Sequence, residues 1–216
     1  MFDWNYAWDI LPDMLAGLVV TVQATLGGMA LALVLGLLWA VAGRSRFRAV
    51  AWSVRWLVEF VRSTPLLVQL YFLFFVLPDL GLSMSPFVTG VLGLGLHYSA
   101  YTAEVYRAGI EAVPRPQWEA ALALNFSRTR TWVAVILPQA VPPVIPALGN
   151  YLIAMFKDTP LLAAITVMEM LQVAKLIGSE HFRYLEPLTL VGLLFLAVSL
   201  ISSRLIRHLE KRYGRI

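Results

Sequence analysis

The chain contains no cysteine, so a disulfide framework and a thiolate metal site are both excluded. Charged residues are also scarce, at 14% of the 216 residues, where a soluble domain carries roughly a quarter. Because 59% of the residues are apolar, this small amount of charge cannot cover the core of a water-soluble protein. A lipid bilayer must therefore solvate much of the surface, and the length suits a single domain over residues 1–216.

Motifs for catalysis and nucleotide binding are missing as well. The chain has no Gly-x-x-x-x-Gly-Lys-Ser/Thr loop, which a protein needs in order to cradle ATP phosphates itself. The three histidines, His97, His181 and His208, are scattered, so they indicate neither a metal site nor an activated nucleophile. An intramembrane enzyme would need paired catalytic side chains at depth, and the apolar runs hold none. We therefore expect no enzymatic activity and no metal or cofactor bound by this chain.

The apolar runs predict an all-α membrane protein with five spanning helices. A hydrocarbon core of about 30 Å requires roughly 20 helical residues. The predicted spans cover residues 13–43, 52–77, 86–109, 131–156 and 187–203. The first run follows an acidic start and is far longer than the apolar part of a signal peptide. A shorter apolar stretch, residues 160–168, is too brief to span and is predicted to be re-entrant or interfacial.

The positive residues predict the orientation of these spans. Clusters of arginine and lysine follow the first, third and fifth spans, and five crossings place all three clusters on one side. Short cytoplasmic loops are enriched in these residues, so that side is predicted to be the cytoplasm. The N-terminus and the mixed-charge segment 157–186 then lie outside, and the C-terminus lies inside. The net charge of +4 is explained by these flanking residues, so nucleic acid is not an expected partner.

Charged residues also occur within the second predicted span. Arg55, Glu59 and Arg62 are spaced i, i+4 and i+7, so they share one face of a helix and can pair. Unpaired charge at depth in a bilayer costs several kcal/mol. Two interpretations remain open: the side chains reach the headgroups at the membrane surface, or they take part in gating.

The fourth predicted span carries Pro138, Pro142, Pro143 and Pro146. Proline removes a backbone donor and breaks a helix, and such breaks in lipid occur where the backbone faces protein or a water-filled cavity. Transporters place discontinuous helices along the translocation path. We therefore expect a broken helix that lines the path, although a kinked packing helix is the alternative.

The predicted cytoplasmic loop, residues 111–130, has the pattern of a helix, a sharp turn and a second helix. Pro116 is suited to the first turn of a helix, and the residues from Gln117 to Leu124 are good helix formers. Asn125 is a plausible terminator in the left-handed region. Ser127 can cap the next helix. A compact helix of this kind suits insertion into a groove of a partner.

The same loop resembles the EAA loop of ABC importer permeases. The family pattern is Glu-Ala-Ala, three residues, Gly, nine residues, Ile, any residue and Leu-Pro. The matching residues here are Glu119, Ala120, Ala121, Asn125, Val135, Leu137 and Pro138. Asn125 replaces the glycine and Val135 replaces the isoleucine. Asn is a common substitute for Gly at positive φ, so the turn should survive.

Other stretches resemble the polar-amino-acid branch of this family. They are residues 59–69, 101–107, 149–150 and 157–159. Within that branch, residues 95–99 and 182–187 resemble the ectoine and hydroxyectoine permeases. Many amino-acid members have Glu where this chain has Tyr151, and an aromatic face with Asp158 would suit a compact zwitterion. The residues expected to line the substrate path are Glu59, Thr64, Gln69, Tyr98, Asn150, Tyr151, Asp158 and Thr159.

The resemblance implies an importer with several subunits. Two permease subunits, either two copies or two homologous chains, would pair with an ABC ATPase dimer and an extracytoplasmic solute-binding protein. ATP and Mg²⁺ would bind to the ATPase subunits, and Glu119, Ala120 and Ala121 would transmit their motion. The implied cargo is ectoine or hydroxyectoine, and the alternative is a polar amino acid such as glutamine, histidine or arginine. A secondary carrier is an alternative of another class, but no internal repeat supports it.

Overall fold

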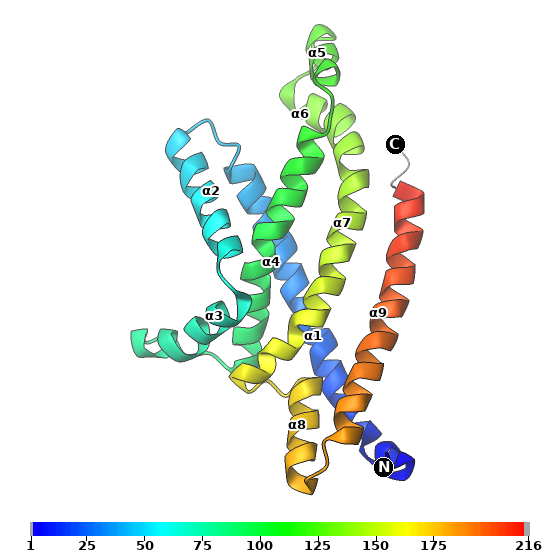
Figure 1. Cartoon of the computed structure of the whole chain (residues 1–216). Coiled ribbons are helices and arrows are strands. Elements are labelled where there is room, and N and C mark those ends of the chain that lie inside the picture. The colour runs from blue at the N-terminus through cyan, green and yellow to red at the C-terminus, as the bar shows by residue number, and fades with distance from the viewer. Residues whose placement is uncertain (1, 214–216) are drawn as a thin grey trace.

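The computed structural model describes residues 2–213, and this range contains helices and no strand. The α-helices are α1 (Trp4–Ala42), α2 (Arg48–Ser63), α3 (Leu66–Tyr71), α4 (Pro86–Glu111), α5 (Arg115–Ala123), α6 (Arg128–Thr131), α7 (Leu137–Asp158), α8 (Met170–His181) and α9 (Leu185–Tyr213) (Figure 1). Two π-helical turns cover Phe72–Val76 and Trp132–Ile136, and two 3-10 helices cover Leu77–Leu80 and Thr159–Ile165. The prediction of an all-α fold is confirmed.

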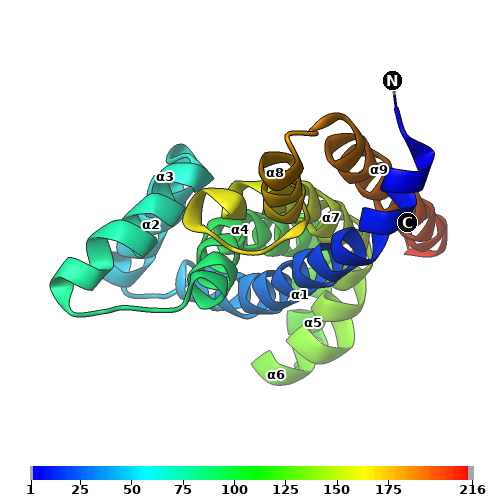
Figure 2. The same ribbon diagram turned by 90° about the horizontal axis from the view of Figure 1, so that it is seen from below.

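The long helices form a bundle whose two ends differ in character. The helices α5 and α6, the start of α2 and the end of α9 lie at one end, and the N-terminus and α8 lie at the other (Figure 1). Viewed from below, α2 and α3 project on one side of the bundle and α9 lies on the opposite side (Figure 2). The positive clusters and the EAA-like loop therefore share one end of the molecule.

The helix α1 begins nine residues before the predicted start of the first span. The side chain of Asp3 accepts hydrogen bonds from the backbone N–H groups of Asn5 (3.0 Å) and Tyr6 (3.3 Å), which caps the helix. Ile10 and Met14 then pack into a cluster with residues of α8 and α9. The predicted span, residues 13–43, is thus the apolar part of a longer helix, because hydropathy does not detect a capped polar first turn.

The helices α1 and α4 pack closely along a seam of small residues. Thr102 on α4 donates a hydrogen bond across the seam to the carbonyl oxygen of Ala32 (2.8 Å). Ala32, Ser99 and Ala103 are almost fully buried there. Small residues let helix backbones approach closely in a membrane, where van der Waals packing and interhelical hydrogen bonds hold helices together. This seam positions α4, on which several candidate site residues lie.

The second predicted span, residues 52–77, is wrong as a continuous helix. It consists of α2 and then α3 with the π-helical and 3-10 turns, and the two halves, Arg48–Ser63 and Leu66–Leu80, are bent by 103°. Pro65 is the cause, since the residue before a proline is pushed out of the helical region. Thr64 accordingly has extended dihedral angles, φ −105° and ψ 136°.

The break expected in the fourth span is absent. The helix α7 runs from Leu137 to Asp158 through Pro142, Pro143 and Pro146. Pro138 lies in its first turn, where the missing N–H is not needed. The distortion is instead the π-helical turn Trp132–Ile136 just before it. Prolines inside spanning helices are tolerated where neighbouring groups satisfy the freed carbonyls, so their number alone did not predict a discontinuity.

A group of ion pairs, here called the latch, joins Asp3 near the N-terminus to the turn between α8 and α9. Arg183 pairs with Glu186 (2.6 Å) and with Asp3 (3.5 Å), and its guanidinium lies 4.2 Å from the ring centroid of Tyr6. Residues 160–168, predicted to be too short to span, form most of a 3-10 helix and the link to α8. This segment and the latch lie at the end of the bundle opposite α5 (Figure 1).

The number of spans is only partly defined. Among the described residues, three helical stretches are long and apolar enough to cross a membrane: Trp4–Ala42, Arg128–Ile165 and Leu185–His208. The bent pair Arg48–Ser63 and Leu66–Leu80 meets the same criterion only when its halves are joined. The helix α4 is not among these stretches and carries Glu104, Arg107 and Glu111 toward its end. The count of five spans therefore stays a prediction.

Candidate functional site

The EAA-like loop forms the predicted helix, turn and second helix. The first helix, α5, spans Arg115–Ala123, with Pro116 in its first turn. Its end has the hydrogen bonds of a Schellman motif: Phe126 N–H donates to the Ala121 carbonyl (3.0 Å), and Asn125 N–H donates to the Leu122 carbonyl (2.9 Å). Asn125 has φ 59°, as this motif requires. The predicted left-handed turn is therefore confirmed.

Because Asn125 has a positive φ, substitutions there test the turn directly. Replacing Asn125 with glycine should preserve or slightly raise thermal stability, whereas replacing it with valine should lower it by about 1–2 kcal/mol. Valine is β-branched and rarely adopts a positive φ. Thermal unfolding of the detergent-purified protein measures the difference. Equal melting temperatures for the two variants would show that the turn is not held in this conformation.

Aromatic contacts hold α5 against the start of the next helical stretch. The rings of Trp118 and Trp132 are 5.3 Å apart in an edge-to-face arrangement. The guanidinium of Arg44, from the turn after α1, lies 5.8 Å from the Trp132 ring. As predicted, Ser127 caps α6 by accepting a hydrogen bond from Arg130 N–H (3.3 Å). A displacement of α5 would therefore be passed to α1 and α7 through packed side chains.

The outer surface of α5 presents both charge and apolar area. Glu119 and Ala120 are exposed, whereas Ala121 is almost fully buried and faces the protein. Leu122 and Leu124 are 76% and 68% exposed. Leu137 and Pro138, the end of the motif, are also exposed at the start of α7. A short rigid helix with two exposed leucines and a carboxylate is suited to contact with another protein.

A polar cluster lies at the bend between α2 and α3. The Gln69 side-chain amide donates hydrogen bonds to the Val61 carbonyl (2.8 Å) and to Thr64 Oγ1 (2.6 Å). Its Oε1 atom lies 3.2 Å from His97 Nδ1 on α4. The freed backbone groups at the bend are thus satisfied by a side chain, and the bend is tied to the middle of α4.

An aromatic cluster lies beside these polar groups. Tyr98 donates a hydrogen bond from its hydroxyl to Asp158 Oδ2 (2.6 Å). The Tyr151 ring centroid lies 6.2 Å from that of Tyr98 and 5.6 Å from that of Tyr101. The guanidinium of Arg62 lies 5.6 Å from the Tyr101 ring. The three tyrosines therefore lie close to both a carboxylate and a guanidinium.

The other predicted path residues are placed differently. Thr159 is fully buried, and its hydroxyl donates to the Phe156 carbonyl (2.7 Å), so it packs instead of facing a cavity. Asn150 is exposed on α7, and Glu59 faces a cleft. Neither His97 nor Tyr101 was among the residues that the sequence predicted to line the path. The sequence signal was available, because these two residues lie four apart on one helix face, on either side of Tyr98.

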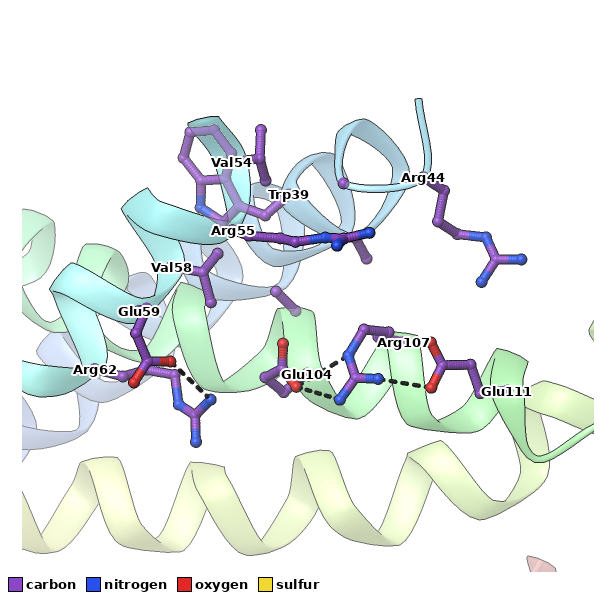
Figure 3. A pocket seen from close by; sticks show the side chains of 13 residues that line it. Trp39, Arg44, Val54, Arg55, Val58, Glu59, Arg62, Glu104, Arg107 and Glu111 are labelled. Atoms are coloured by element: carbon purple, nitrogen blue, oxygen red, sulfur yellow. Dashed lines mark hydrogen bonds and ion pairs between the residues drawn. The ribbon is translucent and has the colours of Figure 1, made fainter. Parts of the chain in front are cut away.

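A cleft of about 710 Å³ separates α2 from α4 and the end of α1 (Figure 3). As their spacing predicts, Arg55, Glu59 and Arg62 all line it along one face of α2. The opposite wall carries Glu104, Arg107 and Glu111 of α4. Among the residues that the structure describes, no group of three His, Asp or Glu side chains could hold a metal ion.

The helical membrane bundle and its short exposed helix with the EAA spacing fit the permease subunit of an ABC importer. Residues 10–215 match the family described as binding-protein-dependent transport system inner membrane component, and the chain belongs to this family.

Several known proteins are similar over nearly the whole chain. The probable amino-acid ABC transporter permease protein y4tG of Sinorhizobium fredii is 50% identical, with 95% of this chain and 89% of the relative covered. The glutamine transport system permease protein GlnP of Escherichia coli is 34% identical, with 98% and 97% covered. The crystal structure of an amino acid ABC transporter with histidines matches with a TM-score of 0.93 and 32% identity, covering 98% of this chain and 99% of that chain. The resemblance found in the loop is thereby confirmed.

Proposed function

We propose that this chain is the membrane-spanning subunit of an ATP-driven importer for a polar amino acid. Relatives that cover nearly the whole chain are named for amino-acid, glutamine and glutamate/aspartate transport. These names favour an amino acid over the ectoine or hydroxyectoine that residues 95–99 and 182–187 suggested. The N-terminus lies outside, and the EAA-like loop and the C-terminus lie in the cytoplasm.

The arrangement around the three tyrosines is the single observation that carries this proposal. A free amino acid has an ammonium group and a carboxylate close together. Asp158 supplies a carboxylate next to Tyr98, and Arg62 supplies a guanidinium next to Tyr101. The tyrosine faces can contact the apolar part of the solute and attract its ammonium group. Thr64 and Gln69 provide further hydrogen-bonding groups beside them.

The partners follow from the family. An ATPase dimer docks on α5 through Glu119 and the neighbouring exposed leucines, and ATP and Mg²⁺ bind to that dimer. A second permease subunit completes the pathway, and a solute-binding protein delivers the amino acid from outside. The contact between Trp118 and Trp132 then carries the motion of α5 into the spanning helices.

Ectoine is a second candidate for the transported solute because of Tyr151. Many amino-acid permeases of this branch have Glu at the position of Tyr151, whose ring lies within 6.2 Å of two other tyrosine rings. An aromatic surface of this kind suits the delocalised cationic centre of a compact zwitterion. The uptake experiment therefore includes ectoine beside the amino acids.

The test is ATP-dependent uptake of radiolabelled polar amino acids and ectoine in vesicles that hold this chain and its partner subunits. The Asp158→Asn variant removes the carboxylate and should lower uptake about tenfold or more, since a charged hydrogen bond contributes about 1.5–3 kcal/mol. The Asp79→Asn variant is the matched control, because Asp79 is exposed and lies outside the cluster. We expect its uptake to be unchanged.

The uptake results distinguish an amino-acid importer from an ectoine importer and from a secondary carrier. Uptake of an amino acid that falls in Asp158→Asn alone supports the proposal. Uptake of ectoine alone would replace the cargo and keep the importer. Replacing Tyr151 with Glu should change the preference among solutes, and an unchanged preference would remove Tyr151 from the site. Uptake that ignores ATP would indicate a secondary carrier instead.

A further inference from the structure

Two rows of charged side chains face each other across the cleft between α2 and α4 (Figure 3). We name these six residues the charge ladder: Arg55, Glu59 and Arg62 on α2, and Glu104, Arg107 and Glu111 on α4. Counted from the end nearest α5, each row has a step of four residues followed by a step of three. This spacing keeps each row on one helix face.

The two rows are complementary in sign. The helices α2 and α4 run in opposite directions (Figure 1), so both rows can be read from the same end of the bundle. In that direction α2 presents positive, negative and positive charges, and α4 presents negative, positive and negative charges. A pair of facing residues, one from each row, is called a rung. Each rung would join opposite charges if it formed: Arg55 with Glu111, Glu59 with Arg107, and Arg62 with Glu104.

The rungs are not formed in this structure, because the charges pair along their own helices. Arg107 binds both Glu104 and Glu111 of α4 at 2.6 Å. Arg62 lies 3.8 Å from Glu59 on α2. Arg55 makes no ion pair with any side chain that the structure describes, and Figure 3 shows it extended with no interaction drawn to a partner. The charges can therefore pair within each helix when the cleft is open and between the helices when it is closed.

The helix α2 has a small buried interface with the rest of the bundle. Only Ala51 and Val58 of its 16 residues are buried, and Val58 packs on Ala100 and Ala103 of α4. It is joined to α3 at Thr64 and Pro65, where the helix is interrupted by a bend of 103° and the Gln69 side chain bonds to Val61 and Thr64. Few buried contacts and a non-helical joint are the features of a hinged element.

We propose that α2 turns on the joint at Thr64 and Pro65 and closes the cleft by forming the three rungs of the charge ladder. The closed ladder is the inner gate of the pathway, and this inference rests on the proposed importer function. Closure exchanges pairs within helices for pairs between helices, so no ladder charge is buried without a partner. The guanidinium of Arg62 lies 5.6 Å from the centroid of the Tyr101 ring, so the last rung forms next to the aromatic cluster.

Charge reversal tests the pairing. Glu59→Arg places an arginine opposite Arg107, and Arg107→Glu places a carboxylate opposite Glu59, so each single variant should lower ATP-dependent uptake about tenfold or more through like-charge repulsion. The double variant restores opposite charges at that rung and should recover closure of the cleft. The matched control is Asp79→Arg, which makes the same chemical change on an exposed residue outside the cleft. Arg62→Glu with Glu104→Arg repeats the test at a second rung.

Because the natural chain has no cysteine, closure can be followed with a single introduced thiol. Val54 lines the cleft and is partly exposed. In inside-out vesicles, Val54→Cys should react with a maleimide when ATP is absent and be protected when a non-hydrolysable ATP analogue is bound. The protection should be lost in Glu59→Arg and should return in the double variant.

These outcomes test the closure of the cleft separately from the identity of the transported solute. The proposal is overturned if the wild-type background transports its solute but ATP does not protect the Val54→Cys thiol. It is also overturned if Glu59→Arg keeps both protection and uptake, or if neither double variant recovers protection while remaining folded by gel filtration. Protection requires only ATP and the ATPase partner, so a wrong cargo leaves this measurement informative.

Discussion

Replacing Glu119 with alanine is expected to abolish ATP-driven uptake while leaving the folded permease intact. Glu119 is exposed on α5 and makes no hydrogen bond or ion pair with another residue of the described range. Its removal therefore costs the isolated chain almost nothing. If the carboxylate docks on the ATPase dimer, its loss leaves a partner group unpaired in the interface, which costs about 2–5 kcal/mol and weakens binding by more than tenfold.

The measurement combines uptake with co-purification of the ATPase. Glu119→Ala should lose both, whereas its melting temperature in detergent should match that of the wild type. Gln117→Ala is the matched control on the same helix, because Gln117 is also exposed and its side chain accepts one long hydrogen bond, from Gln139 Nε2 at 3.4 Å. Normal uptake by Glu119→Ala would mean that α5 does not couple the permease to ATP hydrolysis.

Replacing Gly36 with valine is expected to prevent stable packing of α1 on α4. A Cβ atom at Gly36 would collide with Thr102 Oγ1 and would lie 2.9 Å from the Ser99 carbonyl oxygen and 3.0 Å from the Ala103 nitrogen. Two of these neighbours are backbone atoms, which cannot turn aside. Overpacking of this kind costs typically 1–3 kcal/mol and more where the backbone must shift. The variant should also lose the hydrogen bond between Thr102 and Ala32.

Thermal unfolding and gel filtration in detergent measure this effect. Gly36→Val should melt at least several degrees lower than the wild type or elute as an aggregate, and Gly36→Ala should show a smaller loss. Gly192→Ala is the control, because no atom of the described structure lies within 4 Å of a Cβ atom built there. If Gly36→Val were as stable as Gly192→Ala, the close approach of α1 and α4 would be wrong.

The features that were correctly predicted depend on neighbouring residues. The helix of the EAA-like loop, the left-handed turn at Asn125 and the Ser127 cap are each decided by a few consecutive side chains and their own backbone. The common face of Arg55, Glu59 and Arg62 follows from helical periodicity alone. These are local interactions, so a single sequence contains nearly all the information needed to infer them.

The features that were missed depend on distant partners. Pro65 and four later prolines carry the same local tendency to disrupt a helix, yet only Pro65 produced a sharp bend. At that bend, Gln69 bonds to Val61 and Thr64, and His97 from α4 holds the Gln69 side chain. The continuity of α7 and the early start of α1 likewise depend on packing against other helices. Thr159 was expected to line the path because no sequence pattern reveals that its side chain is buried.

The sequence by itself determined that this chain is a helical membrane protein with an EAA-like helix-turn-helix loop, because apolar runs, flanking charges and the EAA spacing act locally or through the bilayer. Tertiary structure alone decided that Tyr98, Tyr101, Tyr151 and Asp158 meet, and that the charges of α2 face those of α4. Residues from 55 to 158 come together in these sites. Such meetings depend on the bend at Pro65 and on how the helices cross, which are set by packing across the whole bundle.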